Sequence, residues 1–128
     1  MLAHNVYTAA ESAEIAKDVA SKLPGNLFKP LQCTNCASAI VSALKAEGVS
    51  GEILNITANR GPQGQIANYI ASDLVQKGTT SLTLNGFHQA VRVGDMVFDN
   101  FLRQGVPYSE YMGAIGAPFG VNVTVVPF

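Results

Sequence analysis

The spacing of hydrophobic residues changes near the middle of the chain. Two stretches before residue 50 repeat at helical spacing, whereas most later stretches alternate with period two. The two helical faces consist of Ala16, Val19, Ala20 and Leu23, and of Ala37, Ile40, Val41 and Leu44. Thr8 and Glu11 fit a capping box that starts the first helix. Helices followed by strands favour an α+β domain in which N-terminal helices pack on an antiparallel sheet.

The second helix is expected to begin just before Cys36. Thr34 or Asn35 can cap it, because either side chain accepts a hydrogen bond from a first-turn N–H group. Gly48 supplies the permissive backbone that ends the helix. Cys36 is therefore expected in the first turn of this helix, and Cys33 ahead of it.

The alternating stretches predict strands over residues 52–57, 81–84, 87–93, 96–99 and 121–126. Gly94-Asp95 is a suitable two-residue hairpin loop, which places Val93 opposite Met96. Counting back along this hairpin gives the register of the residues that precede it. The last strand is expected to complete the sheet.

Two stretches have weaker patterns. A short helix is predicted where apolar residues recur every four positions, at Ile66, Ile70 and Leu74. It is expected to end near Gly78. Residues 101–118 are expected to be irregular, with one helical turn begun at Ser109.

The composition indicates one globular domain over residues 1–128, with residues 1–7 as a loose arm. The hydrophobic share is 48% and the charged share 13%, which argues against disorder. A net charge of -1 gives no general attraction to nucleic acid or to an anionic membrane. No apolar run is long enough to span a bilayer. Two cysteines are too few for a disulfide framework, so we expect reduced thiols and a reducing compartment.

Cys36 is the predicted nucleophile of the chain. Free N–H groups and the positive end of the helix dipole stabilise an anion in the first turn of a helix. That environment lowers the pKa of a thiol and so favours the reactive thiolate. The alternative for Cys36 is a buried apolar cysteine, and Cys33 is interpreted as a packing residue.

A cysteine nucleophile needs a base and a group that orients the base. His88 lies in the clearest strand pattern, whereas His4 belongs to the loose arm. The hairpin register puts Asp99 on the same face as His88, at a diagonal distance. A slip of one residue would select Asn100 instead, so Asn100 is the fallback. Asp99-Asn100 can also be interpreted as an Asx turn that ends a strand.

These residues suggest an acyl-transfer site. Cys36 attacks a carbonyl carbon, His88 carries the proton, and Asp99 fixes the imidazole tautomer. The N–H of Cys36 and the side-chain amide of Gln32 are the predicted oxyanion donors. No metal ligand set and no cofactor are expected.

Three blocks carry a family resemblance: residues 32–37, residues 85–91 and residues 97–100. They read Gln-Cys-Thr-Asn-Cys-Ala, Asn-Gly-Phe-His-Gln-Ala-Val and Val-Phe-Asp-Asn. In this order they resemble the papain-fold toxin domains at the C-termini of bacterial polymorphic toxins. The resemblance implies a papain-like fold and cysteine-dependent attack on an amide, either as peptide cleavage or as glutamine deamidation or transamidation.

The resemblance also implies a setting for that activity. The domain would be delivered as the C-terminal part of a larger toxin and act on a protein in the cytoplasm of a target cell. A cognate immunity protein would neutralise it.

Two other function classes stay open. A catalytically silent papain-like binding domain would have an ordinary pKa of about 8.5 at Cys36. A dithiol oxidoreductase would use both cysteines, with Cys33 as the reactive one. A zinc site would need about four ligands, and His4 and His88 lack finger spacing.

Overall fold

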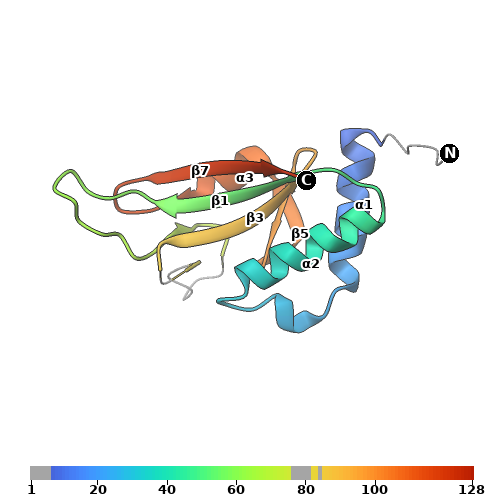
Figure 1. Ribbon diagram of the computed structural model, residues 1–128, viewed down its shortest axis with the longest axis horizontal. Helices are drawn as coiled ribbons and strands as arrows, with labels where there is room; N and C mark the ends of the chain where they lie inside the picture. Colours follow the sequence, from blue (N-terminus) through green and yellow to red (C-terminus); the bar gives the residue numbers. More distant parts are fainter. Residues whose placement is uncertain (1–6, 76–81, 84) are drawn as a thin grey trace.

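The protein combines a curved antiparallel sheet with helices on both of its faces (Figure 1). The computed structural model describes residues 7–75, 82–83 and 85–128. Within them lie helices α1 (Ala9–Lys22), α2 (Cys33–Ala46) and α3 (Tyr108–Ala114), and a 3₁₀ turn η1 (Gly25–Leu27). The sheet contains β1 (Glu52–Ala58), β3 (Phe87–Val93), β4 (Met96–Asp99), β5 (Leu102–Pro107) and β7 (Val121–Pro127), and a smaller pair contains β2 (Ala71–Ser72) and β6 (Ile115–Gly116).

The strands of the main sheet follow the order β5-β4-β3-β1-β7, with every neighbouring pair antiparallel. β7 therefore completes the sheet beside β1, as predicted. The predicted papain-like α+β architecture, with N-terminal helices on an antiparallel sheet, is confirmed.

Two hydrophobic cores cover the opposite faces of this sheet. Side chains alternate along a strand, so Val91 and Val93 of β3 pack with the apolar faces of α1 and α2. The intervening Ala90 packs on the other face, with Tyr111 of α3. The central strands are thus covered on both faces, whereas Val125 and Val126 of the edge strand β7 are 44% and 43% exposed.

The hairpin of β3 and β4 has the predicted register. Val93 pairs with Met96, and the pairing continues to Val91 and Phe98, where it stops. β3 nevertheless continues back to Phe87, paired on its other side with β1. The N-terminal half of β3 therefore has no β4 partner, and this opening is where the candidate site forms.

The helix predicted from Ile66, Ile70 and Leu74 is wrong. Ile70 forms a bridge with Thr83, and β2 follows directly. A spacing of four fits a strand as well as a helix, and Ile66 is 66% exposed whereas Ile70 is fully buried. Gly78 lies outside the described residues, as do the ends of the strand predicted over residues 81–84.

Residues 101–118 are more regular than predicted. They contain β5, the two-turn helix α3 and β6. β5 pairs with β4 with a register shift between Val97 and Asp99. Gly105 and Pro107 interrupt its alternation in the sequence, and this explains why the pattern did not indicate a strand.

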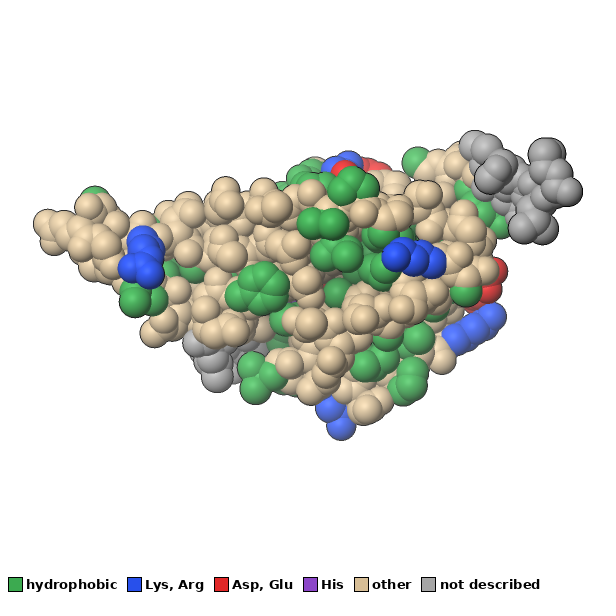
Figure 2. Space-filling model, in the orientation of Figure 1, with side chains coloured by type: hydrophobic (Ala, Val, Ile, Leu, Met, Phe, Trp, Pro, Cys, Tyr) green, Lys and Arg blue, Asp and Glu red, His purple; other side chains and the backbone are tan. Residues whose placement is uncertain are grey.

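Charged side chains are scattered on the face shown in Figure 2, without a large cluster of one sign. This distribution agrees with the net charge of -1. No helix in the described part of the chain has the length and apolarity that a bilayer crossing requires.

Candidate active site

α2 begins at Cys33, three residues before Cys36. Leu31 precedes it in the left-handed region, at φ 68°, and Gln32 is the N-cap. The N–H of Cys36 donates the first intrahelical hydrogen bond, to the Gln32 carbonyl at 2.8 Å. The predicted helix start, and with it the free first-turn N–H of Cys36, is therefore wrong. The N–H groups that precede the first helical bond belong to Cys33 and the two residues after it.

Neither predicted cap, Thr34 or Asn35, caps α2. No side chain caps the N-terminus of α2. The Asn35 amide instead donates to Gln32 Oε1 at 2.9 Å. Gln32 and Asn35 thus bond to each other beside Cys33, and the first turn keeps its free N–H groups.

Cys36 lies in the hydrophobic core under α1 and α2, with no exposed surface. Burial raises the pKa of its thiol to about 12, and the charges of Asp99 and Cys33 act in the same direction. This is the environment of an inert core cysteine. The structure does not bring Cys36 to His88.

Cys33 has the opposite environment. It is half-buried, and its Sγ lies 3.9 Å from the Thr34 hydroxyl. Burial alone would raise its pKa, but interactions with the His88 imidazole, the backbone N–H of Gln89 and the Thr34 hydroxyl lower it below the usual value. Gln89 lies in the half of β3 that has no β4 partner. Its backbone N–H is therefore available to the Cys33 sulfur at the start of α2.

His88 is fully buried, and its two ring nitrogens have different surroundings. Nε2 lies 3.0 Å from Asp99 Oδ2, whereas Nδ1 is buried and has no hydrogen-bond partner. Burial lowers the pKa of His88, but the hydrogen bond to Asp99 and the nearby Cys33 thiol outweigh it and raise the pKa to about 9. The same thiol–imidazole interaction thus favours a thiolate on Cys33 and a proton on His88.

Asp99 ends β4 and has a partner for each carboxylate oxygen. Oδ1 accepts the backbone N–H groups of Phe101 at 2.8 Å and Leu102 at 2.9 Å, which forms the turn into β5. Oδ2 faces His88 and also accepts the Tyr111 hydroxyl at 3.0 Å. Burial and the Asp99 charge raise the pKa of Tyr111 well above its usual value, so the hydroxyl keeps its proton.

Asn100, the fallback orienting residue, turns away from His88. Its amide nitrogen donates to the Lys29 carbonyl at 2.7 Å. It therefore ties the turn after β4 to the segment that leads into α2. His4 lies outside the described residues.

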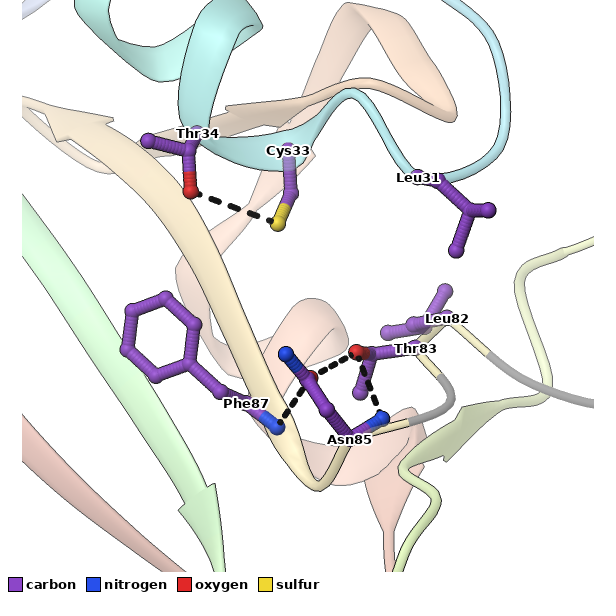
Figure 3. A pocket seen from close by; sticks show the side chains of 7 residues that line it. All are labelled: Leu31, Cys33, Thr34, Leu82, Thr83, Asn85 and Phe87. Carbon is purple, nitrogen blue, oxygen red and sulfur yellow. Dashed lines mark hydrogen bonds between the residues drawn. The ribbon is translucent and has the colours of Figure 1, made fainter.

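A pocket of about 340 Å³ opens beside Cys33 (Figure 3). Cys33 and Thr34 at the start of α2 face Asn85 and Phe87 across it. The remaining lining side chains are Leu31, Leu82 and Thr83. The pocket gives a substrate access to the Cys33 sulfur, whereas the core gives none to Cys36.

Tyr111 and Asn85 are site residues that the sequence reasoning missed. Tyr111 reaches Asp99 only because α3 packs on the sheet, and this contact has no sequence signal. Asn85 stands in the block that contains His88, so its position in that block was the available signal. In the part of the chain that is described, no group of three or more His, Cys, Asp or Glu side chains could hold a metal ion.

Comparison with known proteins identifies one family. The sequence model of a family described as papain fold toxin 2 matches residues 14–115. The matched range includes α2, β3, β4 and α3 and therefore every site residue described above. No curated protein and no solved structure matches the chain.

Proposed function

The chain belongs to the papain fold toxin 2 family, and we propose that it is a cysteine-dependent enzyme that attacks amide bonds of a protein in a target cell. Cys33 is the nucleophile, His88 the proton carrier and Asp99 the orienting carboxylate. Cys33 thereby takes the role that the sequence pattern gave to Cys36.

One observation carries this proposal: a single buried imidazole interacts with a thiol and with a carboxylate. Its Nε2 bonds Asp99 Oδ2 at 3.0 Å. Its Nδ1 has no hydrogen-bond partner and can accept the proton of the Cys33 thiol. The thiol can therefore act as nucleophile, the imidazole as base and the carboxylate as the group that orients the imidazole.

The choice of Cys33 over Cys36 rests on access, charge and position. Cys33 lines the pocket, and its pKa is lowered. Cys36 is buried, and its pKa is raised to about 12. Cys33 also occupies the first position of α2, where the helix dipole stabilises a thiolate most.

The reaction follows from these positions. Cys33 Sγ bonds to the carbonyl carbon after its proton has moved to His88 Nδ1. The protonated imidazole then gives that proton to the leaving nitrogen as the C–N bond breaks, which leaves a thioester on Cys33. Water attacks the thioester with His88 as base and releases the acid, or an amine takes the place of water and forms a new amide.

The oxyanion that forms during attack needs donors beside Cys33. The backbone N–H of Cys33 precedes the first helical bond of α2. The Gln32 amide lies next to it, with its oxygen held by Asn35, so its NH₂ group is the second donor. Losing such a donor typically costs about 3 kcal/mol of transition-state stabilisation.

The proposed setting follows from the toxin family and from the thiol chemistry. Free thiols stay reduced in a cytosolic compartment, so we expect the domain to act in the cytoplasm of the target cell. We expect it to be delivered as part of a larger bacterial toxin and to be neutralised by a cognate immunity protein. Its product is a cleaved, deamidated or transamidated target.

The matched variants Cys33→Ala and Cys36→Ala test the proposal. Each is expressed in bacterial cells without the immunity protein, and growth and the intact masses of cellular proteins are measured. Cys33→Ala should abolish toxicity and all target modification, whereas Cys36→Ala should retain both. Circular dichroism of the purified variants reports whether each one is folded.

The outcomes separate the alternatives. Toxicity of a folded Cys33→Ala variant without target modification would support a binding domain and contradict the proposed chemistry. Equal loss in both folded variants would support a dithiol oxidoreductase. Loss in Cys36→Ala alone would return the nucleophile to Cys36.

A further inference from the structure

The Asn85 amide is held in one orientation at the edge of the pocket. Its Oδ1 accepts the backbone N–H of Phe87 at 3.1 Å and the Thr83 hydroxyl at 2.5 Å. A backbone N–H only donates, so the amide atom facing it must be the oxygen. The opposite atom, Nδ2, therefore carries two N–H donors.

Those donors are free to bind a substrate. Nδ2 makes no hydrogen bond to any part of the chain that is described. Figure 3 shows the amide nitrogen on the side that faces Cys33. Asn85 and Cys33 line the same pocket, so a group bound by Nδ2 lies in the pocket that the proposed nucleophile also lines.

The pocket offers an uncharged environment around these donors. Its apolar walls are Leu31, Leu82 and Phe87. Apart from the proposed Cys33 thiolate, which repels an anion, the described lining residues include no charged side chain, so an ionised substrate group would find no oppositely charged partner among them. An uncharged group with a hydrogen-bond acceptor can pack against the apolar side chains and accept a hydrogen bond from Nδ2.

We propose that Asn85 is a specificity-determining residue that binds the carbonyl oxygen of an uncharged substrate side chain in this pocket. The inference rests on the proposed function, because it assumes that substrate reaches Cys33 through the pocket. The apolar walls contact the methylene groups of the side chain, and Nδ2 donates to its carbonyl. A side chain of equal length without a carbonyl leaves Nδ2 unpaired and binds more weakly.

A protection experiment tests this assignment without a known target. The initial rate of Cys33 alkylation by iodoacetamide is measured by peptide mass mapping, in rising concentrations of benzyloxycarbonyl-Gln-Gly or benzyloxycarbonyl-Met-Gly. The glutamine peptide should protect Cys33 at a concentration about fivefold lower than the methionine peptide, the effect of one neutral hydrogen bond.

Asn85→Asp keeps the acceptor for Phe87 and Thr83 and replaces the Nδ2 donors with a negatively charged oxygen. It should abolish the fivefold preference, and so should Asn85→Ala. Asn122→Asp, a matched change at an exposed position of β7, should keep the preference.

Equal protection by the two peptides, protection by neither, or a preference that persists in both Asn85 variants would overturn the role of Asn85. These results leave the reactive Cys33 intact. No alkylation of Cys33 in the folded wild type would contradict the proposed function itself, and this inference with it.

Discussion

Asp99 combines a structural and a chemical role in one side chain. Its Oδ1 forms the turn between β4 and β5, and its Oδ2 bonds His88. The two interpretations of Asp99 from its sequence, an Asx turn and an orienting carboxylate, therefore describe different oxygens of the same group. Fixing Oδ1 to the backbone also fixes the direction of Oδ2, which presents it to the imidazole.

Tyr111 shares Asp99 Oδ2 with His88. In Tyr111→Phe this oxygen loses one donor, so its attraction for the protonated imidazole strengthens. The pKa of His88 should then rise further above about 9. Two histidines in the chain make a ¹⁵N NMR titration of the imidazole rings straightforward to assign.

The control for this prediction is Tyr69→Phe, at a tyrosine that is 47% exposed. It should leave the His88 titration unchanged. An unchanged His88 titration in folded Tyr111→Phe would mean that Tyr111 serves packing alone.

At the scale of elements, the site depends on the short pairing between β3 and β4. The ladder stops at Val91 and Phe98, and the start of α2 approaches the open half of β3. β5 then continues from the Asp99 turn and returns beside β4. The position of β5 therefore supports the turn that presents Asp99.

Gly105 lets β5 pack closely against β4. It has φ +75°, and an added Cβ would lie 2.6 Å from the Phe98 ring. Gly105→Ala should lower the free energy of unfolding by about 2–3 kcal/mol, through backbone strain and overpacking. Urea unfolding followed by circular dichroism measures this change.

Gly113→Ala is the matched comparison. Gly113 lies in α3, and a Cβ there meets no atom within 4 Å. Alanine should leave stability unchanged or raise it by up to about 1 kcal/mol through helix propensity. Equal effects of the two substitutions would contradict the proposed packing of β5.

The elements that the sequence predicted well are those with a strong local period. Phe87–Val93 and Met96–Asp99 have the predicted bounds, and the capping box of Thr8 and Glu11 is present. The start of α2 was missed because a cap contributes only about 1 kcal/mol. Contacts such as that between Asn100 and Lys29, 71 residues apart, are outside any local pattern.

The observed N-cap, Gln32, lies two or three residues before the predicted caps, Thr34 or Asn35, and this shift decides which cysteine begins the helix. A start at Cys33 directs its thiol to the pocket and puts Cys36 into the core. The His88–Asp99 pair was predictable, because one hairpin contains both residues. Tyr111 and the backbone N–H of Gln89 were not, since they depend on how separate elements pack.

At the scale of the whole molecule, two side chains connect the sheet to the helical layer. Asn100 bonds the carbonyl of Lys29. The Arg103 guanidinium donates to the carbonyls of Ala20, Ser21 and Leu23 at the C-terminus of α1. A cation at this end also complements the helix dipole. These contacts hold α1 and the segment before α2 against the edge of the sheet.

Arg103→Gln should therefore lower the free energy of unfolding by about 2 kcal/mol, since hydrogen bonds to a charged group are lost. Urea unfolding measures the difference. Arg60→Gln, at an exposed position in the loop after β1, should change stability by less than about 0.5 kcal/mol. A similarly small change for Arg103→Gln would argue against this connection.

The most direct test of the central claim is the alkylation rate of each cysteine in the folded protein as a function of pH. The lowered pKa of Cys33 and the raised pKa of His88 keep a thiolate present below the usual thiol pKa of about 8.5. Peptide mapping after iodoacetamide treatment at pH 6 should find Cys33 modified and Cys36 unmodified, and His88→Asn should move the reaction of Cys33 to higher pH. Faster modification of Cys36 than of Cys33 in the folded protein would contradict the account.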